Sequence, residues 1–313
     1  MRRHRIARYA LLAALGLVFG SGCGWDLGPR REAVTPPYPI PPDRRVTAPP
    51  AGDLLLWLEE DSGGQSMQFD SSGRVLRWND HRRAARAVAG QGGFLGAADT
   101  VTLRTPDGAT RTVRALRCRE RVAERCSYAL IDSTVPPAEL SLDHSAYTVL
   151  GVVRRTSDRG DNYFVMTTGR DCSSLFGGTG CHSNSALHLG WSGGRTVRLG
   201  QYDNDVVIDR VPEFSEARSL PTLFSGSSTG TIEKVRYFDS EIYFMRTGAS
   251  SSLLMDSGTL MVGGTAFTGA GGPGVPDWRF DGQIFAVLVY KQALTDALLV
   301  QAESYLRNRF GPR

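Results

Sequence analysis

Residues 280–310 read FDGQIFAVLVYKQALTDALLVQAESYLRNRF. The run IFAVLVY, 284–290, is apolar at every position, which is typical of a central strand covered on both faces. Thr295 is a good N-cap for the helix that follows, and Gly311 with Pro312 ends it. An apolar stripe on this helix is formed by Leu298, Leu299, Ala302, Tyr305, Leu306 and Phe310. We expect the stripe to pack on the core rather than to bind a partner.

Upstream of this segment, short apolar runs alternate with clusters of Gly, Ser, Asn and Asp. ALHLGW at 186–191 and TVRLGQY at 196–202 alternate as half-buried strands do, and the residues between them suit a hairpin turn. Further strand-like runs are LLLWL 54–58, RVLRW 74–78, TVTLR 101–105, YTVLGVVRR 147–155, YFVMTT 163–168 and EIYFMRT 241–247. The pattern predicts an all-β, two-sheet antiparallel sandwich over residues 53–313, with a short C-terminal helix.

The first 22 residues contain four arginines, no acidic residue and an apolar run too short to span a bilayer. They are predicted to be a secretory signal. GSGC at its end resembles a bacterial lipoprotein signal, with Cys23 as the lipidated residue; ordinary cleavage near Gly22 is the alternative. Gly24 offers no inner-membrane retention signal, so we expect an exported protein, lipid-anchored in the bacterial envelope and preferably in the outer membrane.

Residues 23–52 are predicted to be a proline-rich tether, because eight of the sixteen prolines lie between Gly24 and Gly52. Extended at about 3.1 Å per residue, such a segment reaches roughly 90 Å. An arm packed on the domain is the alternative. Beyond the signal, 32 basic residues balance 32 acidic ones. The charge therefore gives no argument for a nucleic-acid partner.

After Cys23, four cysteines remain, an even number in a chain predicted to be exported. Two local disulfides, Cys118 with Cys126 and Cys172 with Cys181, are the simplest of three connectivities, because each closes a short loop. A zinc site with His182 and His188 is the alternative, although the cysteine spacings differ from those of zinc modules.

The segments DLLLWLEEDSG, GRVLRWND, YTVLGVVRR, ALHLGWSGGRTVRLGQYDND and RFDGQIFAVLVYKQALTDALLVQAESYLRNRFG follow one another in this order. In order and spacing they resemble the concanavalin A-like lectin/glucanase domains of the laminin G-like type. The resemblance implies a jelly-roll sandwich that binds carbohydrate or protein, with a minority of catalytic members.

Glucanases of this fold carry Glu-x-Asp-x-(x)-Glu on a strand, so that alternation brings the carboxylates into one cleft. Glu59 and Asp61 match the first two positions, but Gly63 and Gly64 stand where the last carboxylate belongs. Two Gly-x-Ser-x-Gly matches, around Ser192 and Ser228, lack a histidine downstream. Whether the protein is an enzyme is therefore uncertain. The sequence favours a non-catalytic protein, and it assigns no catalytic residue.

A calcium ion is the one cofactor that the sequence suggests, at Asp203, Asn204 and Asp205, whose side chains offer oxygen ligands. An Asx-rich turn is the alternative. Three aromatic residues are candidates for a sugar platform: Trp191, Tyr202 and Trp278. For Trp191, packing inside the domain, as expected for Trp57 and Trp78, is the favoured alternative.

We therefore expect a lectin-like envelope protein that binds glycan or another envelope or extracellular component. The alternatives are a structural or adhesion protein that contacts other proteins, and an atypical glycoside hydrolase.

Overall fold

The computed structural model describes fourteen stretches of the chain: 43–60, 66–90, 96–105, 108–118, 129–131, 141–158, 160–167, 184, 187–201, 204–215, 220–239, 243–254, 260–263 and 280–311. The predicted signal segment and Cys23 lie outside these residues, so their processing stays a prediction. Within the described residues, no helix is long and apolar enough to cross a membrane.

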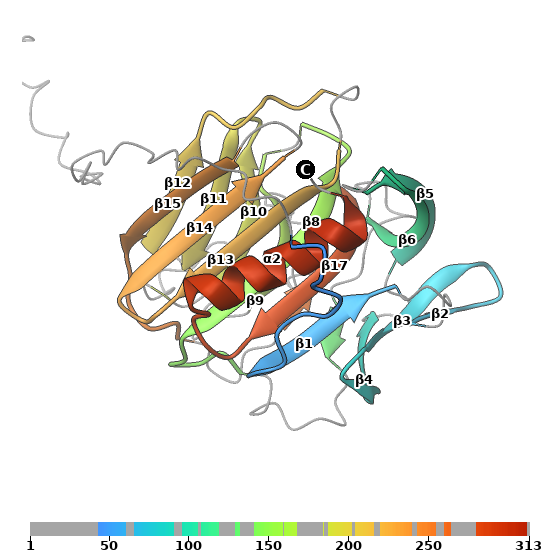
Figure 1. Ribbon diagram of the computed structural model, residues 1–313, viewed down its shortest axis with the longest axis horizontal. Coiled ribbons are helices and arrows are strands. Elements are labelled where there is room, and N and C mark those ends of the chain that lie inside the picture. Colours follow the sequence, from blue (N-terminus) through green and yellow to red (C-terminus); the bar gives the residue numbers. More distant parts are fainter. Residues whose placement is uncertain are drawn as a thin grey trace, which may run out of the picture. The chain divides into compact units, whose positions relative to one another are not determined.

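The larger of two antiparallel sheets has the strand order β15-β14-β13-β8-β17-β6-β5-β3-β4-β7, with β1 paired to β17 and β2 to β3 (Figure 1). Its strands are β1 (Leu54–Glu59), β2 (Met67–Phe69), β3 (Arg74–Asp80), β4 (Arg83–Gly90), β5 (Gly96–Arg104), β6 (Thr110–Cys118), β7 (Ala129–Ile131), β8 (Tyr147–Arg155), β13 (Thr222–Ser228), β14 (Ile232–Phe238), β15 (Tyr243–Ala249) and β17 (Gly282–Tyr290).

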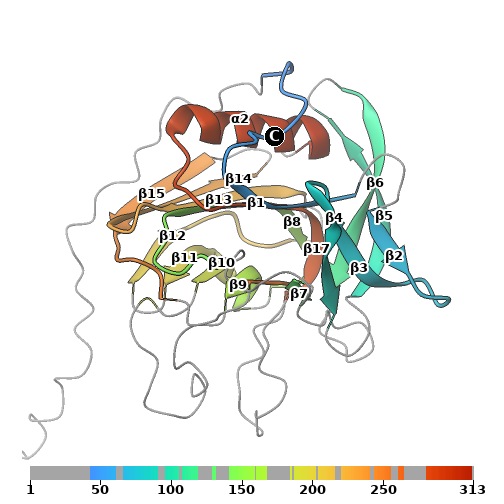
Figure 2. The same cartoon turned by 90° about the horizontal axis from the view of Figure 1, so that it is seen from below.

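The smaller sheet has five strands in the order β12-β11-β10-β9-β16. They are β9 (Asn162–Thr167), β10 (Leu187–Gly193), β11 (Thr196–Gln201), β12 (Asn204–Asp209) and β16 (Leu260–Val262). Figure 2 shows this sheet under one face of the larger sheet, with helix α2 (Asp296–Phe310) over the opposite face. The predicted β-sandwich with a C-terminal helix is therefore confirmed.

Strand β17 explains why residues 284–290 are apolar throughout. One set of its side chains, including Ile284, Val287 and Val289, packs between the sheets. The other set, including Phe285 and Leu288, packs under the helix. All nine residues of the strand are buried, as predicted for a strand covered on both faces.

Helix α2 begins and ends where the sequence predicts. The Thr295 side chain accepts a hydrogen bond from the Leu298 backbone N–H, and Gly311 adopts the left-handed conformation while its N–H donates to the Arg307 carbonyl. The helix buries Leu299, Ala302, Leu306 and Phe310 against the outer face of the larger sheet. Its stripe therefore packs on the domain, as expected.

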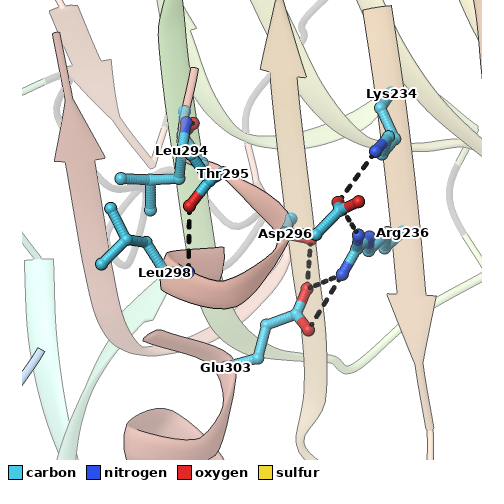
Figure 3. Close-up of polar contacts among 9 residues, drawn as sticks. Lys234, Arg236, Leu294, Thr295, Asp296, Leu298 and Glu303 are labelled. Atoms are coloured by element: carbon cyan, nitrogen blue, oxygen red, sulfur yellow. Dashed lines mark hydrogen bonds and ion pairs between the residues drawn. The ribbon is translucent and has the colours of Figure 1, made fainter. Parts of the chain in front are cut away.

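Charged side chains also hold the helix on the sheet (Figure 3). Arg236 of β14 lies 3.4 Å from the Glu303 carboxylate and donates to Asp296 at 2.9 Å, and Lys234 donates to the same Asp296 oxygen. Ser225 of β13 donates to Glu303 at 2.8 Å. Burial raises the pKa of the Glu303 carboxyl, and the neighbouring Arg236 limits the rise.

The described end of the predicted tether, residues 43–52, contacts helix α2. Asn308 donates to the backbone carbonyls of Asp43 and Val46, and the Asp43 N–H donates to Ser304. Val46 also packs against the apolar cluster under the helix. These last residues before Asp53 therefore pack on the helix. The tether over residues 23–52 stays a prediction.

Candidate functional site

The outer face of the five-stranded sheet carries the most distinctive group of polar side chains in the described residues. On β10, β11 and β12, the residues Leu189, Trp191, Val197, Leu199, Val206 and Ile208 belong to the core between the sheets. Because side chains alternate along a strand, His188, Arg198 and Asp205 face the opposite way. We call these three residues together with Tyr163 of β9 the outer-face cluster.

The strand register brings the members of this cluster together. His188 pairs with Gly200, and Gly200 pairs with Asp205, so the three form one row across the sheet. The His188 imidazole crosses the row and places Nε2 3.9 Å from Asp205 Oδ1. A Cβ at residue 200 would overlap both the imidazole and the carboxylate, so this contact requires glycine at that position.

Arg198 and Asp205 form the accessible part of the cluster. Arg198 Nη1 lies 3.0 Å from Asp205 Oδ2, and the two side chains are 31% and 25% exposed. The carboxylate thus has a cationic group on one oxygen and an imidazole near the other. A ligand that reaches this pair meets fixed donors and acceptors side by side.

Tyr163 and His188 form the buried base of the cluster. Their rings meet edge to face with centroids 4.7 Å apart, and both residues are at most 5% exposed. The Tyr163 hydroxyl donates to Asp161 at 3.0 Å. Burial raises the pKa of Tyr163 well above its usual value, although Arg198 opposes the rise, so the phenol is a neutral donor at physiological pH.

Trp191 is not a sugar platform, and its packed alternative is correct. It is 1% exposed and lies between the sheets, where its ring meets Phe224 edge to face at 4.6 Å. The Arg155 guanidinium lies 5.1 Å from the ring centre. Trp78 is buried as expected, and Trp57 is half-buried beside His81. Tyr202 and Trp278 lie outside the described residues.

The predicted calcium ligands do not converge in the way the sequence suggested. Asn204 and Asp205 are neighbours on β12, so their side chains point to opposite faces of the sheet. Asp205 faces Arg198, whereas Asn204 donates its amide to Asn184 at the inner side. These two side chains therefore cannot share one ion; Asp203 lies outside the described residues.

Glu59, the first position of the incomplete glucanase pattern, contacts side chains of helix α2. Its carboxylate accepts a hydrogen bond from the Tyr305 hydroxyl at 2.5 Å and lies 3.6 Å from Arg309. Asp61 is outside the described part of the chain. Ser192 and Ser228 lie within strands β10 and β13, not at a strand-to-helix turn.

Cys118 is fully buried at the end of β6. The partners considered for it and for the other cysteines are outside the described stretches, namely Cys126, Cys172, Cys181 and His182. The disulfide pairing therefore stays a prediction.

Tyr163 and Arg198 were not predicted as site residues from the sequence. The signal for Arg198 was present, because alternation in LHLGW and TVRLG puts His188 and Arg198 on the polar face of adjacent strands. Tyr163 gave no such signal, because β9 is irregular: the pairing of β9 with β10 shifts between Leu189 and Gly190. Such a shift changes which side chains share a face.

No protein-family model and no curated protein sequence matches the chain. Among solved structures it is similar to CBM40 of the Ruminococcus gnavus IT-sialidase bound to alpha2,3 sialyllactose, with 16% identity over 51% of this chain and 82% of that one and a TM-score of 0.36. It is also similar to domain 4 of an extracellular arabinanase from Geobacillus stearothermophilus in complex with arabinotriose, with 15% identity over 81% and 98% of the two chains and a TM-score of 0.43.

A third similar structure is an arabinofuranosidase complexed with arabinofuranosyl-alpha-1,2-xylobiose, at 11% identity and a TM-score of 0.47. The likeness covers 82% of this chain and 60% of that enzyme. These scores assign no function to the chain. Its class, a two-sheet β-sandwich with a helix on the larger sheet, follows from its own strand order.

Proposed function

We propose that this chain is a non-catalytic glycan-binding module, and that the glycan binds at the outer-face cluster. One observation carries the proposal: the partly exposed Arg198 and Asp205 form a 3.0 Å pair over the buried rings of Tyr163 and His188, around Gly200 on a single sheet face.

The chemistry of the cluster suits a sugar. A guanidinium and a carboxylate held 3.0 Å apart can donate to one hydroxyl and accept from its neighbour, and vicinal hydroxyls are the recurring feature of glycans. Because Arg198 and Asp205 already hold each other, binding immobilises few additional rotamers. The buried Tyr163 and His188 rings keep the base of the cluster rigid.

The rest of the proposal concerns where the module works. We place it in the bacterial envelope, exported by its N-terminal signal and anchored through a lipid on Cys23, with the outer membrane preferred. The chain beyond the signal has balanced charge, which suits a neutral glycan or an envelope component rather than a polyanion. The assignment as non-catalytic agrees with Glu59 being occupied by Tyr305 and Arg309.

The test is a glycan array with the purified protein, followed by calorimetric titration of the strongest hit. Arg198→Met keeps the aliphatic stem but removes the guanidinium, and we expect at least about tenfold weaker binding from the loss of one charge-assisted hydrogen bond. Arg74→Met is the matched control, because Arg74, at the start of β3 in the other sheet, forms a 2.7 Å ion pair with Asp70, close in length to the 3.0 Å pair of Arg198 with Asp205. It should bind as the unmodified protein does.

An array without any retained glycan, or a hit that Arg198→Met binds unchanged, would contradict the proposal. The first result would favour a structural or adhesion role through protein contacts. Release of reducing sugar from the hit would favour the atypical glycoside hydrolase instead.

A further inference from the structure

A second polar group lies inside the sandwich, remote from the solvent. Tyr147 of β8, Ser228 of β13 and Glu233 of β14 stand side by side in one row of the larger sheet, because Ser228 pairs with both of the others. Their strand neighbours Val149, Phe224 and Val235 belong to the core between the sheets, so the row faces inward. All three side chains are buried, Glu233 and Tyr147 completely.

The opposite sheet and a nearby connection complete this group. Gln201, at the end of β11, is completely buried and donates its amide to the Ser250 hydroxyl at 3.1 Å. Ser250 in turn donates to Glu233 Oε1 at 3.1 Å. Burial raises the pKa of both Tyr147 and Glu233, and the nearby Gln201 side chain opposes both rises, so it faces both groups. We call Tyr147, Gln201, Ser228, Glu233 and Ser250 the oxygen cluster.

Three buried atoms of the oxygen cluster have no hydrogen-bond partner within normal hydrogen-bond distance in the described structure. They are Glu233 Oε2, the Gln201 carbonyl oxygen Oε1 and the Tyr147 hydroxyl. Nor does any Arg, Lys or His side chain of the described residues form an ion pair with Glu233, in contrast to Glu303 and its partner Arg236. A buried carboxylate and a buried amide oxygen without a hydrogen-bond partner lower the stability of the folded state.

Burial raises the pKa of Glu233 to about 8, and the Asp205 carboxylate behind the sheet contributes to the rise. No cationic side chain is among the groups that shift the pKa of the Glu233 carboxyl. A bound cation would supply the positive charge that a carboxylate at this position lacks.

We propose that the oxygen cluster binds a calcium ion between the two sheets. The donors are a carboxylate, an amide carbonyl and hydroxyl groups, and all are oxygens, the ligand type that this hard cation prefers. A single carboxylate gives weak affinity, in the range of about 10⁻⁴ to 10⁻³ M that extracellular calcium modules show. The site differs from the predicted Asp203–Asp205 segment and does not depend on glycan binding at the outer-face cluster.

Thermal unfolding of the purified protein in EDTA and in 10 mM CaCl₂, at pH 7.5 and equal ionic strength, tests this proposal. With a dissociation constant near 1 mM, calcium raises the ratio of folded to unfolded protein about tenfold. For a domain of this size the melting temperature then rises by roughly 3 to 6 °C. MgCl₂ should give less, because Mg²⁺ demands a tighter octahedral shell.

Two variants locate the ion. Glu233→Gln should abolish the calcium-dependent rise, whereas Asp205→Asn, which alters the previously predicted ligand on the outer face, should keep it. Should Glu233→Gln fail to fold, Tyr147→Phe removes one oxygen with little change in shape and should at least halve the rise.

The proposal is overturned if the unmodified protein melts at the same temperature with and without calcium, because the oxygens are then satisfied by water or by protonation. It is equally overturned if Asp205→Asn removes the rise and Glu233→Gln keeps it, or if Tyr147→Phe leaves it unchanged.

Discussion

The ion pair between Arg236 and Glu303 should stabilise the docking of helix α2, and replacing either partner alone should destabilise the protein. Each side chain is 6% exposed, so removing one leaves the other in a poorly solvated position. Breaking a buried pair from one side typically costs about 3 to 5 kcal/mol. We expect about 3 kcal/mol for Glu303→Leu, because Arg236 keeps its second partner Asp296 at 2.9 Å.

Arg236→Met should behave differently, because a carboxyl group can escape its charge by taking up a proton. Burial already raises the pKa of Glu303, and loss of the guanidinium raises it further. The cost of Arg236→Met should therefore be smaller at pH 5 than at pH 8, whereas that of Glu303→Leu should change less. The double variant should cost at least about 2 kcal/mol less than the sum of the two single variants.

The double-mutant cycle compares the unmodified protein, the two single variants and the double variant. Urea unfolding followed by circular dichroism at pH 5 and pH 8 measures the free energy of unfolding of each. The Arg74→Met variant, at an exposed pair on β3, is the control and should change the free energy of unfolding by less than about 1 kcal/mol. Additive single variants with losses under 1 kcal/mol would refute the reasoning, since the pair would then contribute nothing beyond what a surface pair does.

Two further outcomes are expected. In EDTA, the free energy of unfolding should fall as the pH rises from about 4.5 to about 8, because folded Glu233 holds a proton that the unfolded chain has already released. The fall is at most about 5 kcal/mol, and Glu233→Gln should lack it in urea titrations at each pH; a parallel curve for the variant would contradict the assignment. Gly200→Ala should displace the His188 imidazole and weaken glycan binding at least tenfold in calorimetry, with a small loss of melting temperature. Unchanged affinity would show that the His188 position does not matter.

The sequence predicted the elements whose signal is local. Strand β17 and helix α2 are continuous apolar patterns with caps, and each lies where the pattern puts it. Strands β13 and β14 were missed because their hairpin is rich in Ser and Gly. In the structure, these small residues contact the helix on one face and the smaller sheet on the other. Ser225 donates to Glu303 of the helix, and a Cβ on Gly226 would overlap Leu199 of the smaller sheet.

The candidate sites were harder to predict because they depend on register between strands. Asn204 and Asp205 look like a pair in the sequence, yet alternation separates them by the thickness of the sheet. His188 and Asp205 are far from adjacent in the sequence, yet they meet over Gly200. Glu233 looks like an ordinary charged strand residue until its pairing with Ser228 places it inward.

The contact of Asp43 and Val46 with Asn308 fixes where any force on the N-terminus enters the domain. A pull on the N-terminal segment would load the last turns of the helix first and the five-stranded sheet last, since these lie on opposite sides of the larger sheet (Figure 2). The outer-face cluster therefore lies on the side of the domain away from the point where this force enters.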